Sequence, residues 1–267
     1  MARITLIPAP EVFRYKDGIV IQGHFPSKAV LEIVKAEGPF KLTLFDPPYG
    51  DIVDEQWDKH DPKTLVRDFV EWSNVIAKHT LDGGAYYFWG GIGKPLYRPF
   101  FEFLANVEAL TPWRMAMLIT WSKRRAYGVQ NNYLFTREEC AFFIKGDPKK
   151  PLVFNVPYLE AKRGYPGYNP EYPAKSEHYR RTAVWSDITE IFRGKEHPTQ
   201  KPSTLYQIPI LAHTMPGDTV FDPMAGSGTT AIAARETGRR FLIVERDPTY
   251  CALIRKRLDP SQAILEH

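Results

Sequence analysis

Residues 219–245 carry two apolar strands, a glycine turn and a helix in close succession. A strand over 219–222 precedes the turn that contains Gly226 and Gly228, and a helix over 229–237 leads to a second strand over 240–245. A strand–helix–strand unit of this kind joins two parallel strands of one sheet. Comparable apolar strands are predicted at 11–15, 19–22, 40–45, 85–89, 114–121 and 138–144, and helices at 62–82, 95–107 and 203–214. Asp61 is the predicted cap of the helix 62–82, with Gly83 and Gly84 after its end, and Ser27 and Asp247 are predicted to begin two further helices. The sequence therefore predicts an α/β fold, with a doubly wound, mixed but mostly parallel sheet covered on both faces.

Length and composition are those of a globular enzyme with its own core. The chain has 267 residues, of which 43% are apolar and 25% charged. We expect Cys140 and Cys251, which lie far apart in apolar stretches, to be buried free thiols. No apolar stretch reaches the roughly 20 residues that span a bilayer, and the run after Met1 is too short for a signal peptide. We expect a cytoplasmic protein without a metal site.

The regular pattern fails between residues 145 and 184, which are rich in proline, tyrosine and basic residues. This segment has an excess of four positive charges, which equals the formal net charge of the whole chain. Its basic residues are Lys145, Lys149, Lys150, Lys162, Arg163, Lys175, Arg180 and Arg181, and its acidic residues are Asp147, Glu160, Glu171 and Glu177. A local basic excess favours a polyanionic partner, although a flexible loop with solvated charges has the same composition. We therefore divide the chain into a catalytic domain, residues 1–144 and 185–267, and a basic insertion, residues 145–184.

The glycine turn predicts a ligand site. Its glycines let the backbone turn tightly and let a ligand approach closely, and Glu245 ends the next strand, where a carboxylate can accept the ribose hydroxyls of a nucleoside. The same spacing, with Ala231, also satisfies the loose dinucleotide fingerprint, and a bare turn without any ligand is possible. Asp222 favours a third reading, because a carboxylate at the turn would repel a pyrophosphate but suits the ammonium group of S-adenosyl-L-methionine.

A second turn, Asp46-Pro47-Pro48-Tyr49, ends the apolar strand 40–45. The interpretation without a functional role is a rigid proline turn with a surface tyrosine. Its chemical interpretation is a pair of fixed acceptors, the Asp46 carboxylate and the Pro47 carbonyl. Such acceptors can hold both protons of an exocyclic amino group and stabilise positive charge that develops on its nitrogen. Tyr49 would then stack on a base flipped out of the duplex.

Together, residues 46–49 and 221–228 resemble the amino-methyltransferases of restriction-modification systems. The catalytic motif precedes the cofactor motif, an order similar to the permuted β group of these enzymes, and residues 197–202 resemble a further cofactor motif. The resemblance implies a Rossmann-like methyltransferase fold and the cofactor S-adenosyl-L-methionine. It assigns catalysis to Asp46, Pro47, Pro48 and Tyr49. It assigns cofactor binding to Asp222, Met224, Ala225, Gly226, Ser227, Gly228, Thr229 and Glu245, with Thr199 and Lys201 on the methionine carboxylate. His24 stands where the family often has an aspartate that contacts the cofactor's adenine.

The resemblance also makes the basic insertion a target-recognition region for double-stranded DNA. We expect cations there and at 123–125, directly after a predicted strand, to contact phosphates; they are Lys123, Arg124, Lys162, Arg163, Arg180 and Arg181. A homodimer and a cognate restriction endonuclease are implied as partners.

The sequence thus predicts a DNA methyltransferase that acts on adenine N6. Cytosine N4 is the alternative target, although the cytosine enzymes more often carry a serine at the position of Asp46. A nicotinamide-dependent oxidoreductase built on the Gly226 turn, and a non-catalytic DNA-binding subunit, are alternatives of other classes; both leave the 46–49 turn unexplained.

Overall fold

The computed structural model of the chain describes residues 8–49, 62–92, 97–127, 131, 133–162, 176–191 and 200–259. Its strands are β1 (Glu11–Tyr15), β2 (Gly18–Gln22), β3 (Phe40–Phe45), β4 (Thr80–Gly90), β5 (Trp113–Tyr127), β6 (Phe135–Lys145), β7 (Tyr158–Lys162), β8 (His178–Arg180), β9 (Val184–Trp185), β10 (Thr219–Asp222) and β11 (Arg240–Glu245). Its helices are α1 (Lys28–Glu37), α2 (Pro62–Lys78), α3 (Tyr97–Leu110), α4 (Ser203–His213), α5 (Thr229–Glu236) and α6 (Pro248–Leu258).

Nine of these strands form one mixed sheet in the order β1-β2-β11-β10-β3-β4-β6-β5-β9. The central pairs β2–β11, β11–β10, β10–β3 and β3–β4 are parallel, as is β5–β9 at the edge. The pairs β1–β2, β4–β6 and β6–β5 are antiparallel. The prediction of a mixed, mostly parallel sheet is confirmed.

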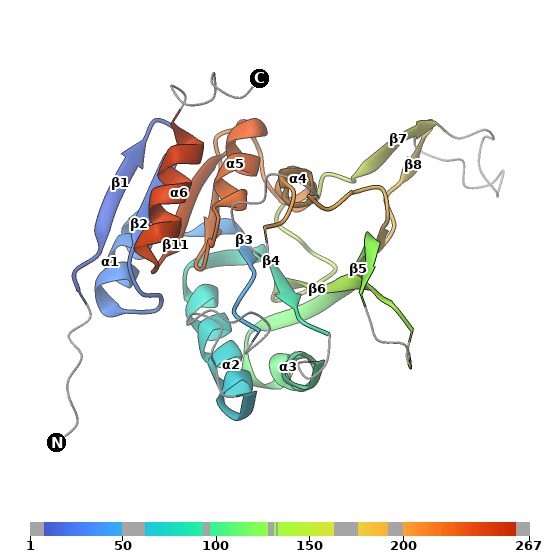
Figure 1. Cartoon of the computed structure of the whole chain (residues 1–267), viewed down its shortest axis with the longest axis horizontal. Helices are drawn as coiled ribbons and strands as arrows, with labels where there is room; N and C mark the ends of the chain where they lie inside the picture. The colour runs from blue at the N-terminus through green and yellow to red at the C-terminus, as the bar shows by residue number, and fades with distance from the viewer. Residues whose placement is uncertain are drawn as a thin grey trace.

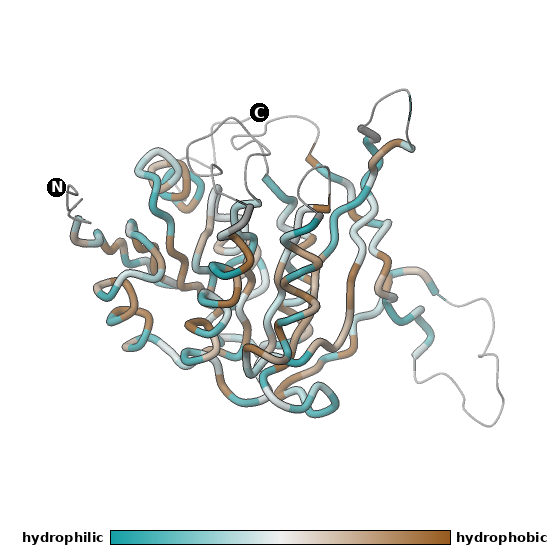
Figure 2. The backbone as a smooth tube through the Cα atoms, turned by 90° about the horizontal axis from the view of Figure 1, so that it is seen from below, coloured by the Kyte–Doolittle hydropathy of each residue, from teal (hydrophilic) through white to brown (hydrophobic). Residues whose placement is uncertain are grey.

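Helices cover both faces of the sheet, as Figure 1 shows. One buried cluster joins the sheet to α4, α5 and α6 through residues such as Leu205, Ala231 and Ile254. The other joins it to α1, α2 and α3 through residues such as Val34 and Phe69. In Figure 2 the brown, hydrophobic stretches gather in the body of the molecule and teal stretches mark outer turns. Two separate cores on opposite faces are the packing of a doubly wound fold.

The two halves of the sheet meet between β3 and β10. From β3 the chain passes through α2 to β4 on one side, and from β10 it passes through α5 to β11 on the other. The direction of winding therefore reverses between these neighbours. Ligands of open α/β sheets bind at such a switch point, beyond the carboxyl ends of the strands.

Several predicted element ends differ from the structure. Ser27 occupies the N-cap position of α1, but its side chain makes no capping hydrogen bond. Gly83 and Gly84, expected after a helix, lie inside β4, where the pairing with β3 shifts register. β5 runs on to Tyr127, so residues 123–125 belong to the strand and do not follow it. The predicted cap Asp61 lies outside the described residues, whereas Asp247 caps α6 by accepting from the backbone N of Thr249 at 2.7 Å.

The basic insertion contains more order than its composition predicts. Leu152 donates its backbone N–H to Gly83 O at 2.7 Å, and Asn155 donates to Ala212 O at 2.8 Å, so residues 151–157 run along the body. β7 and β8 then pair antiparallel and form an arm that projects from the body in Figures 1 and 2. Beyond the arm, β9 returns the chain to the sheet beside Thr120 of β5.

Both cysteines are buried free thiols, as predicted. Among the described residues, no helix combines the length and apolar character needed to cross a bilayer.

Candidate active site

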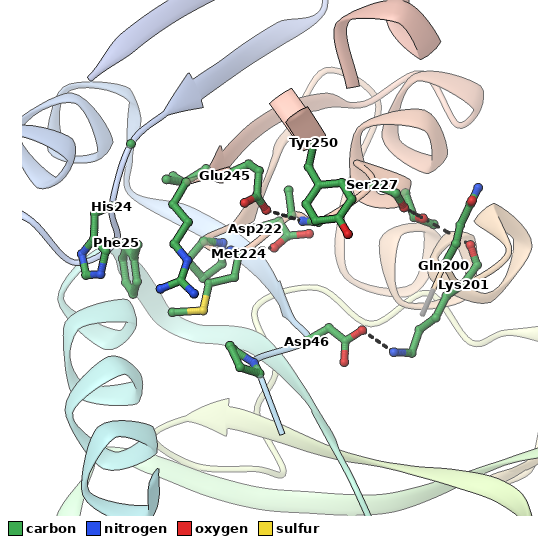
Figure 3. Close-up of a pocket in the computed structure, with 18 of the residues that line it drawn as sticks. His24, Phe25, Asp46, Gln200, Lys201, Asp222, Met224, Ser227, Glu245 and Tyr250 are labelled. Atoms are coloured by element: carbon green, nitrogen blue, oxygen red, sulfur yellow. Dashed lines mark hydrogen bonds and ion pairs between the residues drawn. The ribbon is translucent and has the colours of Figure 1, made fainter. Parts of the chain in front are cut away.

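The 46–49 turn and the glycine turn meet at the switch point. Asp46 follows the last residue of β3, and Asp222 ends the neighbouring β10. Both line a pocket of about 920 Å³, a volume that includes its mouth open to solvent. In Figure 3 His24 and Phe25 stand at one end of the pocket, Asp46 and Lys201 at the other, and Asp222 and Glu245 between them. The structure thus brings together the two turns that the sequence analysis singled out.

The glycine turn is held in a left-handed conformation. Gly226 and Gly228 have φ angles of 53° and 76°, values that favour glycine. A Cβ on Gly228 would lie 2.8 Å from Ile254 Cγ1, so a side chain there would collide with α6. Ala225 donates its backbone N–H to Val244 O at 2.8 Å, which fixes the turn against β11. The turn therefore brings its backbone to the pocket wall, together with the side chains of Met224 and Ser227.

The Glu245 carboxylate is fixed from two sides at the end of β11. Its Oε2 accepts from Gly226 N at 2.7 Å and its Oε1 accepts from Asp247 N at 2.8 Å. Burial raises the pKa of this carboxyl, and the two backbone donors oppose the rise. Each carboxylate oxygen retains a second lone pair, so Glu245 can accept a ligand's hydroxyl groups while its orientation stays fixed.

Asp222 is a buried carboxyl whose hydrogen-bond donors are neutral. Its Oδ1 accepts from Met224 N at 3.1 Å and its Oδ2 accepts from the Thr230 hydroxyl. Burial, with smaller contributions from Asp46 and Glu245, raises the pKa of Asp222 to about 7. A buried acid of this kind favours a cationic ligand group, because the cation offsets the desolvation of the carboxylate.

The Asp46 carboxylate is held by two side chains. The Tyr49 hydroxyl donates to Oδ1 and the Lys201 ammonium donates to Oδ2. Lys201 is only 5% exposed, and its ammonium also lies 3.4 Å from Glu138 Oε2. Burial and the Asp46 charge raise the pKa of the Tyr49 hydroxyl well above its usual value, so Tyr49 stays a neutral donor.

Most residues predicted for the site line this pocket. From the sequence-based set these are Asp46, Pro48, Lys201, Asp222, Met224, Ala225, Gly226, Ser227, Thr229 and Glu245. Pro47 and Tyr49 are not among the lining residues. Pro47 is buried, and Tyr49 packs on Gly91, where an added Cβ would lie 3.1 Å from the tyrosine ring. Gly228 caps α5 instead of lining the pocket. Thr199 lies outside the described residues.

The structure places His24, which the sequence analysis had singled out, in the pocket wall and adds residues that were not assigned to the site. Gly23, His24 and Phe25 follow β2, which is parallel to β11, so they reach the same end of the sheet as Glu245. Trp72 of α2, Tyr206 of α4 and Tyr250 of α6 complete the wall. The parallel pairing of β2 with β11 could have indicated the first group; the other three depend on how the helices pack, which no local motif encodes.

The predicted DNA-contacting cations differ in their surroundings. Arg124 and Arg180 are exposed, and Lys162, also exposed, is 3.8 Å from Glu177. In contrast, Arg181 makes a two-pronged contact with Asp187 at 2.6 and 2.7 Å, and Lys123 pairs with Glu138. Arg163 lies outside the described residues. The structure thus engages Arg181 and Lys123 in ion pairs within the protein.

Comparisons with known proteins agree with this geometry. Residues 40–256 match the sequence model of the family N6_N4_Mtase, described as DNA methylase. The type II methyltransferase M2.LlaDCHI of Lactococcus lactis subsp. cremoris is 27% identical over 272 residues, which cover 92% of this chain and 91% of that protein.

Two solved structures share the fold. The M1.HpyAVI-SAM complex has a TM-score of 0.58 and 24% identity, and it covers 85% of this chain and 95% of its own. The cytosine-N4-specific PvuII DNA methyltransferase has a TM-score of 0.67 and 16% identity, with 91% and 86% of the two chains covered.

Proposed function

We propose, from the premise that the chain belongs to the N6/N4 DNA methylase family, that it methylates adenine N6 in double-stranded DNA with S-adenosyl-L-methionine as methyl donor. One observation supports this most: the Asp46 turn and the Asp222–Gly228 turn end neighbouring parallel strands and share one pocket. A family member needs a methyl donor beside an amino acceptor, and these turns supply a place for each.

The residues of the pocket fit S-adenosyl-L-methionine. This cofactor carries a ribose, an ammonium group and a sulfonium methyl. Glu245, fixed by Gly226 and Asp247, suits the ribose hydroxyls, and the buried Asp222 suits the ammonium. Phe25 and Tyr250 offer aromatic faces for an adenine ring. The nicotinamide alternative is not favoured, because the Asp222 carboxyl would face a pyrophosphate.

Asp46 and Pro47 would prepare the target nitrogen. The lone pair of an exocyclic amino group is delocalised into the base, so the nitrogen is a weak nucleophile. The Asp46 carboxylate and the Pro47 carbonyl would accept its two N–H protons and favour a pyramidal nitrogen whose lone pair faces the bound sulfonium methyl. As the C–N bond forms, the bond between the methyl group and the cofactor's sulfur would break, and its electron pair would stay on the sulfur. The fixed Asp46 carboxylate would stabilise the positive charge that develops on the nitrogen, which then releases one N–H proton to solvent.

Asp46 supports adenine as the target, because the related cytosine-N4 enzymes more often carry a serine there. Cytosine N4 remains the competing target, with the same chemistry. The exposed cations Arg124, Lys162 and Arg180 would contact DNA phosphates, and Tyr49 would stack on the extruded base. The homodimer and the partnered restriction endonuclease implied by the resemblance stay predictions.

Product analysis tests the proposal directly. The protein is incubated with labelled S-adenosyl-L-methionine and amplified, unmethylated DNA, and the DNA is digested to nucleosides for mass spectrometry. We expect labelled N6-methyladenine in the wild type and, for Asp46→Ala, a loss of roughly 100- to 1,000-fold in rate with cofactor affinity retained. N4-methylcytosine would correct the target base, and the absence of any labelled nucleoside would refute the proposal.

A further inference from the structure

A line of alternating charges leads from β5, next to the edge strand β9, to Asp46 after the central strand β3. Lys123 of β5 pairs with Glu138 Oε1 of β6, Glu138 Oε2 lies 3.4 Å from the Lys201 ammonium, and that ammonium donates to Asp46. The side chains of Lys123, Glu138 and Lys201 are 18%, 19% and 4% exposed. Two cations and two anions are thus gathered in a largely buried cluster whose formal charges cancel.

Lys201 depends on this cluster for its charge. Burial alone would lower the pKa of its ammonium, but the carboxylates of Asp46 and Glu138 raise the pKa above its ordinary value. The Trp89 and Tyr49 rings, with centroids 5.2 and 5.9 Å from Nζ, offer additional cation–π contact. A buried cation that loses one of two anionic partners is costly, since the missing charge is not replaced by water.

The charge of the Glu138 carboxylate depends in the same way on its two cationic neighbours. Burial would raise the pKa of its carboxyl, but Lys201 and Lys123 together hold that pKa below its usual value. Its Oε2 is buried without an ideal hydrogen bond, and the 3.4 Å approach to Lys201 is the charge contact available to it among the described residues. Glu138 therefore acts on Lys201 mainly as a fixed negative charge.

We propose that Glu138 is a positioning residue for methyl transfer: it holds the Lys201 ammonium against Asp46 and so fixes the carboxylate that receives the target amino group. The inference rests on the proposed function. It gives Lys201 a role different from the one predicted from the resemblance, because its ammonium donates to Asp46 and lies 3.4 Å from Glu138 Oε2.

Other charged and titratable groups lie in and around the cluster that contains the Lys201 ammonium. They are Asp46 and Tyr49 after β3, Glu138 and Cys140 of β6, Lys123 of β5, Tyr206 of α4 and Asp222 of β10. Of these, Asp46 and Glu138 contact the ammonium through carboxylate oxygens. Replacing Glu138 with glutamine therefore removes one of two contacting anions with little change in shape.

The test compares Glu138→Gln with Glu139→Gln. Glu139 is the next residue of β6 and is also an acid. Its carboxylate accepts from Thr120 Oγ1 at 2.7 Å and forms an ion pair with Arg137, so it does not belong to the Lys201 cluster. We expect Glu138→Gln to slow single-turnover methyl transfer roughly 10- to 100-fold, to leave the Kd for S-adenosyl-L-methionine unchanged, and to move the alkaline limb of the rate profile to lower pH. Glu139→Gln should leave the rate and the limb as in the wild type.

A second readout needs no cofactor. In cofactor-free protein, the buried Lys201 ammonium should give a slowly exchanging ¹⁵N NMR signal, assigned by its loss in Lys201→Met. Glu138→Gln should lose that signal at a lower pH than the wild type. Lys201→Met should also retain cofactor affinity; weakened affinity would return Lys201 to the methionine carboxylate and overturn the inference.

A Glu138→Gln variant with the wild-type rate and pH profile would also overturn the inference. A variant with a slower rate but an unchanged pH profile would overturn it too. If Glu138→Gln does not fold, Glu138→Asp decides, because it keeps the charge but shortens the reach: a wild-type rate in that variant refutes positioning. Failure of the proposed function is recognised separately, since the wild-type protein itself would then transfer no methyl group.

Discussion

Tyr87 and His213 form a buried hydrogen bond that joins β4 to α4, with Tyr87 Oη 3.1 Å from His213 Nε2. The other ring nitrogen, Nδ1, lies 2.8 Å from the carbonyl of Val153. A carbonyl only accepts, so Nδ1 carries the proton, Nε2 accepts, and the tyrosine hydroxyl donates. A neutral histidine of one tautomer thus connects the sheet, a helix and the segment that leads to the arm.

This histidine makes the fold sensitive to mild acid. Burial lowers the pKa of His213 from 6.5 to about 4, so between those values the unfolded chain binds the proton and the folded chain does not. Stability contributed by the neutral ring is complete above pH 6.5 and is lost as pH falls toward 4; between pH 7 and 5 the loss is about 2 kcal/mol. Urea unfolding at the two pH values should show a smaller pH dependence for His213→Gln. Equal dependence would contradict the assignment.

Asp222 should make cofactor affinity depend on pH. Its pKa of about 7 in the cofactor-free protein means that protonation below pH 7 removes the charge that suits an ammonium group. Since only the ionised form is competent, the Kd for S-adenosyl-L-methionine should rise about fivefold from pH 7 to 6. Calorimetry should also detect proton release on binding at pH 7. Asp222→Asn should bind weakly with a flat profile; a steep one would assign the titration to another group.

Two glycines with positive φ angles allow the effect of backbone strain to be distinguished from the effect of ligand contact. Gly226 and Gly238 have φ angles of 53° and 71°, but only Gly226 lines the pocket, and a Cβ on Gly238 meets nothing within 4 Å. Alanine at either position should cost roughly 1–2 kcal/mol in unfolding free energy from left-handed strain. Only Gly226→Ala should also weaken cofactor binding, measured by calorimetry. The same affinity in both variants would show that the turn does not approach the ligand.

The arm should account for part of the salt dependence of DNA binding. Lys162 and Arg180 are exposed cations on β7 and β8. Replacing both with alanine should reduce the slope of log K against log salt by about 2, as expected for two phosphate contacts. Lys150 serves as the control, because its side chain is 83% exposed but its backbone lies beside Gly83 in the first half of β4, away from the arm strands. Lys150→Ala should leave the slope unchanged. An unaltered slope in the double variant would exclude phosphate contacts by these residues.

Elements with strong local signals could be predicted from the sequence. The apolar run 40–45 ends at a proline turn, and 219–222 ends at a glycine turn, so both strands have the predicted bounds. Asp247 followed by Pro248 is typical of a helix start, and the cap is formed. Because parallel strands end at one edge of the sheet, the proximity of Asp46 and Asp222 followed from these local signals.

Long-range packing explains what the sequence did not predict. Gly83 and Gly84 usually end a helix, yet here they continue a strand that tertiary pairing with β3 stabilises. Residues 123–125 have a charged pattern typical of a loop, but pairing of β5 with β6 extends the strand, and Glu190 accepts from the backbone N–H groups of Arg124 and Arg125. The contact of Glu138 with Lys201 joins residues 63 positions apart in the printed sequence, beyond the range of any motif.

The arm leaves and rejoins the body at two fixed places. Before the arm, Asn155 donates its backbone N–H to Ala212 of α4; after the arm, Val184 pairs with β5. Changes in length or composition between those attachments should therefore leave the positions of Asp46, Asp222 and Glu245 unchanged. If the arm contacts DNA as proposed, exchange of the projecting hairpin as one unit would give a lineage of such enzymes a new DNA preference without changing the catalytic residues.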